Sequence, residues 1–387
     1  MKQHKIPAVF MRGGTSKALM FLRDDLPENR MKWDKIFKAA IGSPDPNNRQ
    51  LDGMGGGISS LSKVCVVGKS DRDDADIDYT FAQISVNRDN VGYSANCGNM
   101  SSAVGPFAVD EGLVIPNDEE AFVRIYNTNT DKLIHSRFAM DDNVAAVDGD
   151  FELQGVAGTG APVCLEFIDP GGAVTGSFLP TGNVIDVIEV DGVGKVDVSI
   201  VDAGNPCVFV DATVLGVRGT ETPMEIDSMV DVMAKLESIR AHVAVLMGLV
   251  GKAKDAAQFS PSLPFVGIIS SPQDSKTLSG EKVKADQADL TVRILSSGNI
   301  HRALPLTGAI CCASAAYIVD SIVHRHTRKA ALEGSYKENN LRMMQPSGIL
   351  PVASKVVNTV SGWAVEYASV YRTQRRLFEG CVLIRSS

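Results

Sequence analysis

The apolar residues of this chain gather in short runs that are separated by glycine, proline and polar turns. Runs rich in β-branched or aromatic residues, which are typical of strands, occupy residues 8–11, 64–67, 77–86, 122–126, 198–201 and 207–210. Helical spacing is found at residues 33–41, after residue 99, at about 225–249 and from 307 to about 324. Because the strands are many and do not alternate strictly with the helices, the pattern predicts an α+β fold rather than a doubly wound parallel sheet.

Two stretches lack a clear apolar face. Residues 252–289 have weak periodicity and contain several prolines, so they are predicted to be mostly loop. Close to the C-terminus, Arg372, Arg375 and Arg376 are expected to face solvent or an acidic neighbour.

A weak internal echo divides the chain. A β-rich run that ends in a glycine turn occurs at residues 8–14 and again at residues 199–205. Later in each half, Gly98 or Gly308 begins a helical segment of small apolar residues. Because glycine turns are common, an accidental echo is the alternative interpretation.

The echo predicts two like domains, an N-terminal one at residues 1–183 and a C-terminal one at residues 184–387. Each domain would hold one buried helix inside a sheet, and the terminal strand is allowed to cross back to the first domain. The positive ends of the two helices would then face each other across a cleft and bind anionic groups.

The bulk composition is that of an ordinary globular protein, with 387 residues, 44% hydrophobic and 22% charged. The net charge of -8 argues against nucleic acid or an anionic membrane as the main partner. The negative net charge does not exclude a small anionic substrate, because helix N-termini and local basic residues can make a binding site positive. No apolar run resembles a signal segment or spans a bilayer, so a cytoplasmic location is expected.

The cysteines and histidines show no metal or disulfide pattern. Seven cysteines are scattered without regular spacing, and the six histidines lack the spacing of metal ligands. Reduced, free thiols fit the cytoplasm. We therefore expect neither a disulfide framework nor a metal site.

The stretch Asn96–Cys97–Gly98–Asn99 joins a strand-like run to an apolar helix start. A cysteine at that position lies beside unpaired helix N–H groups and the positive end of the helix dipole, which stabilise a thiolate and bind carboxylates. The alternative is an inert buried cysteine, the commoner fate of a free thiol. The polar, turn-forming neighbours favour a functional Cys97.

The glycine loop at residues 11–17 follows the first strand and carries Arg12, Ser16 and Lys17. Such loops present backbone N–H groups to anions, but the spacing is not that of a Walker loop, so ATP is not expected. An ordinary hairpin turn is the alternative interpretation.

Lys63 follows a glycine-rich stretch, residues 53–57, and begins the apolar strand at 64–67. A lysine at the mouth of a buried strand loses solvation, which lowers its pKa and makes it usable as a base. The alternative is a solvated lysine at a strand end.

Near the second helix start, His301 and Arg302 precede Thr307, Gly308 and Ala309. This order resembles a second anion site at a helix N-terminus. A core histidine with satisfied hydrogen bonds is the alternative for His301.

Taken together, these stretches resemble the PrpF family, also called the methylitaconate isomerase family, over nearly the whole chain. The resemblance rests on motifs at residues 11–17, 41–45, 51–56, 62–64, 96–99, 179–183 and 307–309. Each motif is weak alone, but their order and spacing together are specific.

Membership would imply the diaminopimelate-epimerase-like fold, with two pseudo-symmetric domains, each a sheet wrapped around a central helix. Activities in this family move protons on unsaturated di- and tricarboxylates, and they need no cofactor or metal. They include 2-methylaconitate and aconitate isomerisation, 3-methylitaconate Δ-isomerisation and 4-oxalomesaconate tautomerisation. A homodimer would be unsurprising for this fold.

The resemblance also implies site residues. The family's catalytic lysine and cysteine fall on Lys63 and Cys97. The residues expected to bind substrate are Arg12, Thr15, Ser16, Lys17, Asn96, Gly98, Asn99, Met100, Thr307, Gly308 and Ala309.

The chain departs from the family pattern at a few positions. Ala18 replaces a common glycine, and Gln345 stands where a histidine is common. Thr307 and Gly308 stand where racemases of this fold place a second cysteine, so a Lys/Cys isomerase fits better than two-thiol racemisation.

The leading hypothesis is a cofactor-free isomerase that works by allylic proton transfer. Lys63 would remove the proton, helix starts near Gly98 and Gly308 would stabilise the anion, and Cys97 or Lys63 would return the proton. The best substrate guesses are 2-methylaconitate or aconitate (cis–trans) and 3-methylitaconate (double-bond shift). The alternatives are a 4-oxalomesaconate tautomerase, a non-catalytic tricarboxylate-binding protein and, third, a redox thiol that would need Cys65 as its partner.

Overall fold

The computed structural model describes residues 3–93, 96–116, 119–190, 194–333, 340–360 and 362–385. The chain forms two compact units, of which the first is Met1–Glu166 with Tyr371–Ser387 and the second is Phe167–Val370. The boundary that the sequence suggested at residue 183 falls inside the second unit, and the equivalence of two epimerase-like domains stays a prediction. Within the described ranges, no helix is both long and apolar enough to span a membrane.

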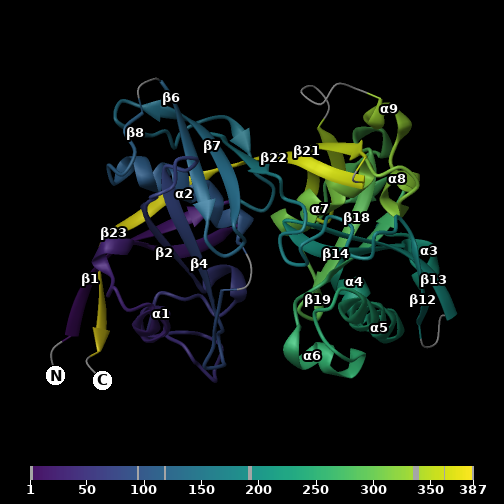
Figure 1. Ribbon diagram of the computed structural model, residues 1–387, viewed down its shortest axis with the longest axis horizontal. Helices are drawn as coiled ribbons and strands as arrows, with labels where there is room; N and C mark the ends of the chain where they lie inside the picture. Colours follow the sequence, from purple (N-terminus) through teal and green to yellow (C-terminus); the bar gives the residue numbers. More distant parts are fainter. Residues whose placement is uncertain are drawn as a thin grey trace. The chain divides into compact units, whose positions relative to one another are not determined.

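The first unit is a mixed sheet with two main helices. Its elements are β1 (Gln3–Gly13), β2 (Ser16–Leu22), α1 (Trp33–Ile41), β3 (Lys63–Lys69), β4 (Ile77–Ile84), β5 (Val91–Gly92), α2 (Gly98–Asp110), β6 (Glu120–Asn127), β7 (Lys132–Asp141), β8 (Val144–Ala145), β9 (Phe151–Glu152), β10 (Thr159–Gly160), β11 (Val163–Ile168) and β23 (Gln374–Arg385). Strand β1 lies between antiparallel β2 and β23, which brings the two ends of the chain side by side (Figure 1). Strand β3 runs parallel to β2 and antiparallel to β4.

The two faces of this sheet have different partners. On one face, a shared core joins side chains of α1 to the strands, and its members include Leu19, Phe21, Trp33, Phe37, Val64, Val66, Ala82 and Ile84. Helix α2 is buried along almost its whole length and contacts β1, β2, β3, β6, β7, β8 and β23. Because side chains alternate along a strand, Lys63 and Cys65 lie on the face of β3 opposite to Val64 and Val66. These two residues therefore lie on the side of α2, away from α1.

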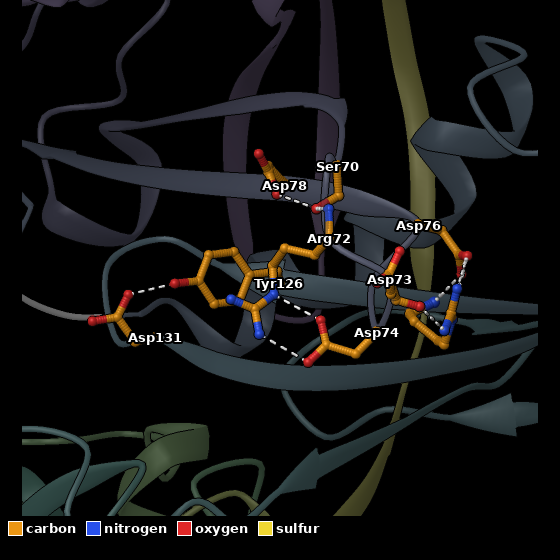
Figure 2. Close-up of polar contacts among 9 residues, drawn as sticks. Ser70, Arg72, Asp73, Asp74, Asp76, Asp78, Tyr126 and Asp131 are labelled. Carbon is orange, nitrogen blue, oxygen red and sulfur yellow. Dashed lines mark hydrogen bonds and ion pairs between the residues drawn. The ribbon is translucent and has the colours of Figure 1, made fainter.

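The loop that joins β3 to β4 is closed by polar contacts at the far end of the hairpin, seen in Figure 2. Arg72 donates two hydrogen bonds to Asp74, at 2.7 and 2.8 Å, and its guanidinium lies 4.3 Å from the ring centroid of Tyr126. Arg124 of β6 donates to Asp76 at 2.8 Å. These contacts bind the loop to β6, which helps to fix the register of the hairpin.

The second unit is also a mixed sheet with helices. Its elements are β12 (Asp186–Val190), β13 (Gly194–Ala203), β14 (Asn205–Asp211), α3 (Ala212–Leu215), α4 (Pro223–Ser228), α5 (Val230–Leu246), α6 (Ala256–Phe259), β15 (Phe265–Ser270), β16 (Ser275–Lys276), β17 (Lys282–Val283), β18 (Leu290–Ser296), β19 (Asn299–Ile300), α7 (Leu306–Ala316), α8 (Ile322–His326), α9 (Lys329–Leu332), β20 (Leu341–Gln345), β21 (Gly348–Thr359) and β22 (Gly362–Arg372). Helix α5 packs with the strands in one core, and α7 is buried along its whole length. Short 3₁₀ turns in the two units are Arg23–Asp25, Arg30–Lys32, Ser59–Leu61, Ala253–Asp255 and Ala285–Gln287.

Each unit contains the local elements that the echo predicted. The hairpin β1–β2 turns at Gly14, which approaches the start of α2, and the hairpin β13–β14 turns at Gly204, which approaches the start of α7. Both glycines have positive φ angles, +52° and +78°, which side-chain-bearing residues rarely adopt. The predicted α+β class is confirmed.

Two predictions from the pattern need correction. The segment 252–289 was expected to be mostly loop, but it contains β15, whose side chains are all buried between β14 and β18. A strand buried on both faces shows no alternation, so its periodicity is lost. The helix expected at 225–249 is two helices, α4 and α5, which meet at Met229 in a non-helical conformation.

Candidate active site

Lys63 lies at the first position of β3, directly opposite Gln83 of β4. Its side chain is 8% exposed, and its Nζ donates to Gln83 Oε1 at 2.6 Å and lies 4.9 Å from the ring centroid of Phe81. The Gln83 Nε2 donates to the carbonyls of Ser59 and Ser62, both at 3.0 Å. Because those donations fix the amide, its oxygen faces the amine, and Lys63 is held in one position.

Cys97 is the N-cap residue of α2 and is 9% exposed. Its backbone is extended, and its carbonyl accepts the N–H of Ser101 at 3.0 Å, the first turn of the helix. The Cys97 side chain accepts no capping hydrogen bond, and its N-cap position puts the residue at the positive end of the helix dipole. This is the placement that the sequence predicted for a reactive thiol.

The pKa of a second thiol, Cys65, depends on both Lys63 and Cys97. Burial raises the pKa of Cys65, and Cys97 raises it further, whereas the Tyr79 hydroxyl and Lys63 oppose the rise. Burial also raises the pKa of Tyr79, and both thiols add to that rise. The Cys65 Sγ lies 3.7 Å from the Tyr79 oxygen. Cys65 therefore stays protonated, and Lys63 and Cys97 influence its pKa in opposite directions.

The glycine loop meets the start of α2. A Cβ on Gly13 would lie 2.7 Å from the carbonyl oxygen of Asn99, and one on Gly14 would lie 2.4 Å from its Oδ1. Asn99 Nδ2 donates to the Thr15 hydroxyl at 3.1 Å. The structure therefore brings Thr15 together with Asn99, and the close approach requires glycine at both preceding positions. Met100, the next helix residue, is fully buried against this loop.

Replacing Gly14 with alanine is expected to lower the free energy of unfolding by about 1–2 kcal/mol and to displace Asn99, because the left-handed backbone and the clash act together. Gly112→Ala is the matched control, since Gly112 also has positive φ (+70°) but a Cβ there meets nothing within 4 Å. Both variants should melt earlier, and only Gly14→Ala should lose catalytic rate. Equal activity losses in the two variants would contradict a role for the approach to Asn99.

Other residues assigned to substrate binding have different surroundings. Arg12 Nη1 donates to the carbonyls of Gly14 and Thr373, both at 3.0 Å, so it shapes the loop. Ser16 is buried and shares the face of β2 with Ala18, which pairs with the first residue of β3. Lys17 lies on the other face, with its Nζ 5.5 Å from the ring centroid of Phe10. The structure does not bring Lys17 together with the lysine of β3, and its role stays a prediction.

Asn96 precedes Cys97 and is buried in a polar network. Its Oδ1 accepts from Asn127 Nδ2 at 3.3 Å and from the Ser101 hydroxyl at 3.4 Å. These bonds hold the residue before Cys97 and Gly98 and thereby position the helix start.

Arg372 was missed by the sequence interpretation, which placed it at the surface. It is 3% exposed, and its Nε donates to Asn99 Oδ1 at 3.2 Å. The expectation of a solvent-facing or acid-paired Arg372 is wrong on both counts among the described residues. A signal was present, since Ala368 and Val370 are buried at alternate positions of β22 and Arg372 continues that alternation. Arg376, by contrast, does pair with acidic neighbours.

The remaining predicted residues belong to the second unit. Thr307, Gly308 and Ala309 are buried in the first turn of α7, and Thr307 Oγ1 accepts from Asn205 Nδ2 at 2.9 Å. Gln345 Oε1 accepts the N–H of Leu304 at 3.3 Å, which supports the approach to this helix. In the described part of the chain, no group of three or more metal-ligating side chains is placed to hold an ion.

Comparison with known proteins decides the family. The family described as "PrpF protein" matches residues 3–385. The chain is 40% identical to the 3-methylitaconate isomerase of Eubacterium barkeri over 386 residues, which is 100% of this chain and 98% of that protein. The chain belongs to the PrpF family. Membership confirms the resemblance seen in the motifs and identifies the protein as an isomerase of that family.

Other relatives agree with this PrpF assignment. The 2-methyl-aconitate isomerase of Shewanella oneidensis is 39% identical over 395 residues, covering 99% of this chain and 97% of that protein. The (4E)-oxalomesaconate Delta-isomerase of a Novosphingobium species is 34% identical over 378 residues, covering 98% and 97%.

Solved structures confirm the predicted fold. A methylitaconate-delta-isomerase matches with a TM-score of 0.86 at 40% identity, covering 99% of this chain and 96% of that one. A hydroxyproline epimerase from Agrobacterium vitis matches with a TM-score of 0.56 at 11% identity, covering 99% and 93%, which shows the fold alone. The PrpF chain therefore has the epimerase-like fold that its motifs implied.

Proposed function

We propose that this PrpF-family isomerase moves a proton within the allylic system of an unsaturated di- or tricarboxylate, without a cofactor. The observation that carries the proposal is the placement of Lys63 on the face of β3 that faces α2, together with Cys97 as the N-cap residue of that helix. A buried amine and a thiol at a helix N-terminus form a set suited to moving a proton on an anionic substrate.

In the first step, the Lys63 amine takes a proton from the carbon allylic to the double bond or next to a carboxylate. The C–H bond breaks, and its electron pair spreads over the double bond and the carboxylate. The N–H groups of Gly98 and Asn99 stabilise this enolate-like anion. The resulting ammonium is held by Gln83 Oε1 and the Phe81 ring.

In the second step, a proton returns either to the same carbon after bond rotation or to the other end of the allylic system. The first course isomerises cis to trans, and the second shifts the double bond. The donor is the Cys97 thiol or the Lys63 ammonium, and no electrons enter or leave in either course.

The activities for which the relatives are named support two substrates first, 2-methylaconitate and 3-methylitaconate. Aconitate has the same carboxylate pattern as its methyl derivative. The relative that acts on oxalomesaconate supports 4-oxalomesaconate as the alternative.

The proposal is tested by incubating the protein in D₂O with each of these four acids and following proton NMR spectra. We expect isomer formation, or deuterium at the allylic carbon, with at least one acid. Absence of both with every acid, from folded protein that still binds tricarboxylates, would replace the proposal with a non-catalytic binding protein.

A further inference from the structure

Arg372 is a buried guanidinium that reaches the start of α2 from the end of β22. It is 3% exposed, its Nη1 donates to the carbonyl of Tyr371 at 2.9 Å, and its Nε donates to Asn99 Oδ1 at 3.2 Å. A buried charge is normally neutralised by an opposite charge.

Arg372 forms no ion pair with an acidic side chain in the described ranges of the chain. Burial alone lowers its pKa, to about 10, and no acidic neighbour offsets that effect. Arg376, four residues later, is the contrast, because Asp110, Glu111 and Glu379 surround it. Within the described residues, the charge of Arg372 thus has no acidic partner and is available to an anionic ligand.

The same guanidinium determines which atoms of Asn99 and Thr15 donate and which accept hydrogen bonds. A guanidinium only donates, so Asn99 must turn its oxygen toward Arg372 and its NH₂ group toward Thr15. The Thr15 oxygen then accepts from Asn99 at 3.1 Å, which leaves the hydroxyl proton available for another acceptor. A half-buried hydroxyl with an available proton beside helix N–H groups is a donor for a carboxylate.

We propose that Arg372, Asn99 and Thr15 form a relay that builds a carboxylate subsite at the start of α2. This inference rests on the proposed function for the identity of the natural ligand. Thr15 and the first-turn N–H groups touch the carboxylate, whereas Arg372 is a positioning residue that orients Asn99 and supplies the uncompensated positive charge. The subsite therefore selects one carboxylate of the substrate.

The test measures binding without turnover, using calorimetry with propane-1,2,3-tricarboxylate, a saturated acid that carries no allylic proton. Arg372→Met is expected to weaken binding about 10- to 100-fold, because the nearby positive charge and the fixed orientation of Asn99 are both lost. Arg372→Lys keeps the charge and should recover part of that loss. Arg376→Met, which removes an arginine already paired with acids, is the control and should bind like the wild type.

Asn99→Asp keeps the test decisive if Arg372→Met does not fold. An aspartate there pairs with Arg372 and cannot donate to Thr15, so we expect the melting temperature to hold or rise while binding of the tricarboxylate weakens. A merely structural Arg372 would not move stability and affinity in opposite directions. Thr15→Val should weaken binding in the wild type and have little further effect on top of Arg372→Met.

The outcomes separate this relay from the proposed function. Unchanged affinity in folded Arg372→Met and in Asn99→Asp would overturn the relay, even if the wild type isomerises its substrate. A wild-type protein that fails to bind the tricarboxylate would overturn it too. Loss of affinity in the variants supports the relay whether or not isomerisation is found.

Discussion

Replacing Lys63 with alanine is expected to lower turnover by about 10²–10⁴-fold, the usual contribution of a positioned general base. The side chain is almost fully buried, and among the described residues it donates to Gln83, which takes no part in abstracting a proton. The other lysine of β3, Lys69, lies at the opposite end of the strand and cannot replace the lost amine. The rate is measured by proton NMR with whichever acid the wild type isomerises.

The matched control is Lys69→Ala, at the exposed end of the same strand. It removes an identical side chain and charge from β3 but should leave turnover unchanged. Thermal melting of both variants checks that the hairpin is intact. Turnover near the wild-type rate in folded Lys63→Ala would remove Lys63 from the mechanism.

The parts of the fold that the sequence predicted are those with a clear local signal. Helix α1 was predicted at its observed bounds because Trp33, Phe37 and Ile41 recur on one face and are buried there. Strand β15 was missed because both of its faces are buried, so no alternation remained. The pairing of β1 with β23 joins the two ends of the chain, and no local pattern predicts a contact over that separation.

The same distinction separates the site residues. Cys97 and Lys63 stand where a helix begins and a strand begins, so the placement of each could be predicted from its immediate neighbours, and their roles stay a prediction. The partner of Lys63 depends on strand register, which places Gln83 opposite it. Arg372 reaches Asn99 across 273 positions of sequence. The charge of Arg372 predicted a surface position, whereas the packing of β22 buries its side chain.

Replacing Cys97 with serine is the second change with a large expected effect, and it decides which group returns the proton. A serine hydroxyl keeps the size of the side chain but is a much weaker acid than a thiol, so we expect turnover to fall by about 10²–10⁴-fold if the thiol is the donor. Deuterium should still enter the substrate from D₂O, because Lys63 continues to remove the proton. Isomer formation and deuterium entry are followed together by NMR.

Cys65→Ser is the matched control, because Cys65 lies two residues from Lys63 on β3 but burial raises its pKa and keeps it protonated. We expect it to lower stability through its buried contact with Tyr79 while leaving both exchange and isomerisation measurable. Full isomerisation by folded Cys97→Ser would assign both proton transfers to Lys63. Loss of deuterium entry as well as isomerisation would mean that the thiol helps to remove the proton, since a pure donor acts only after the anion has formed.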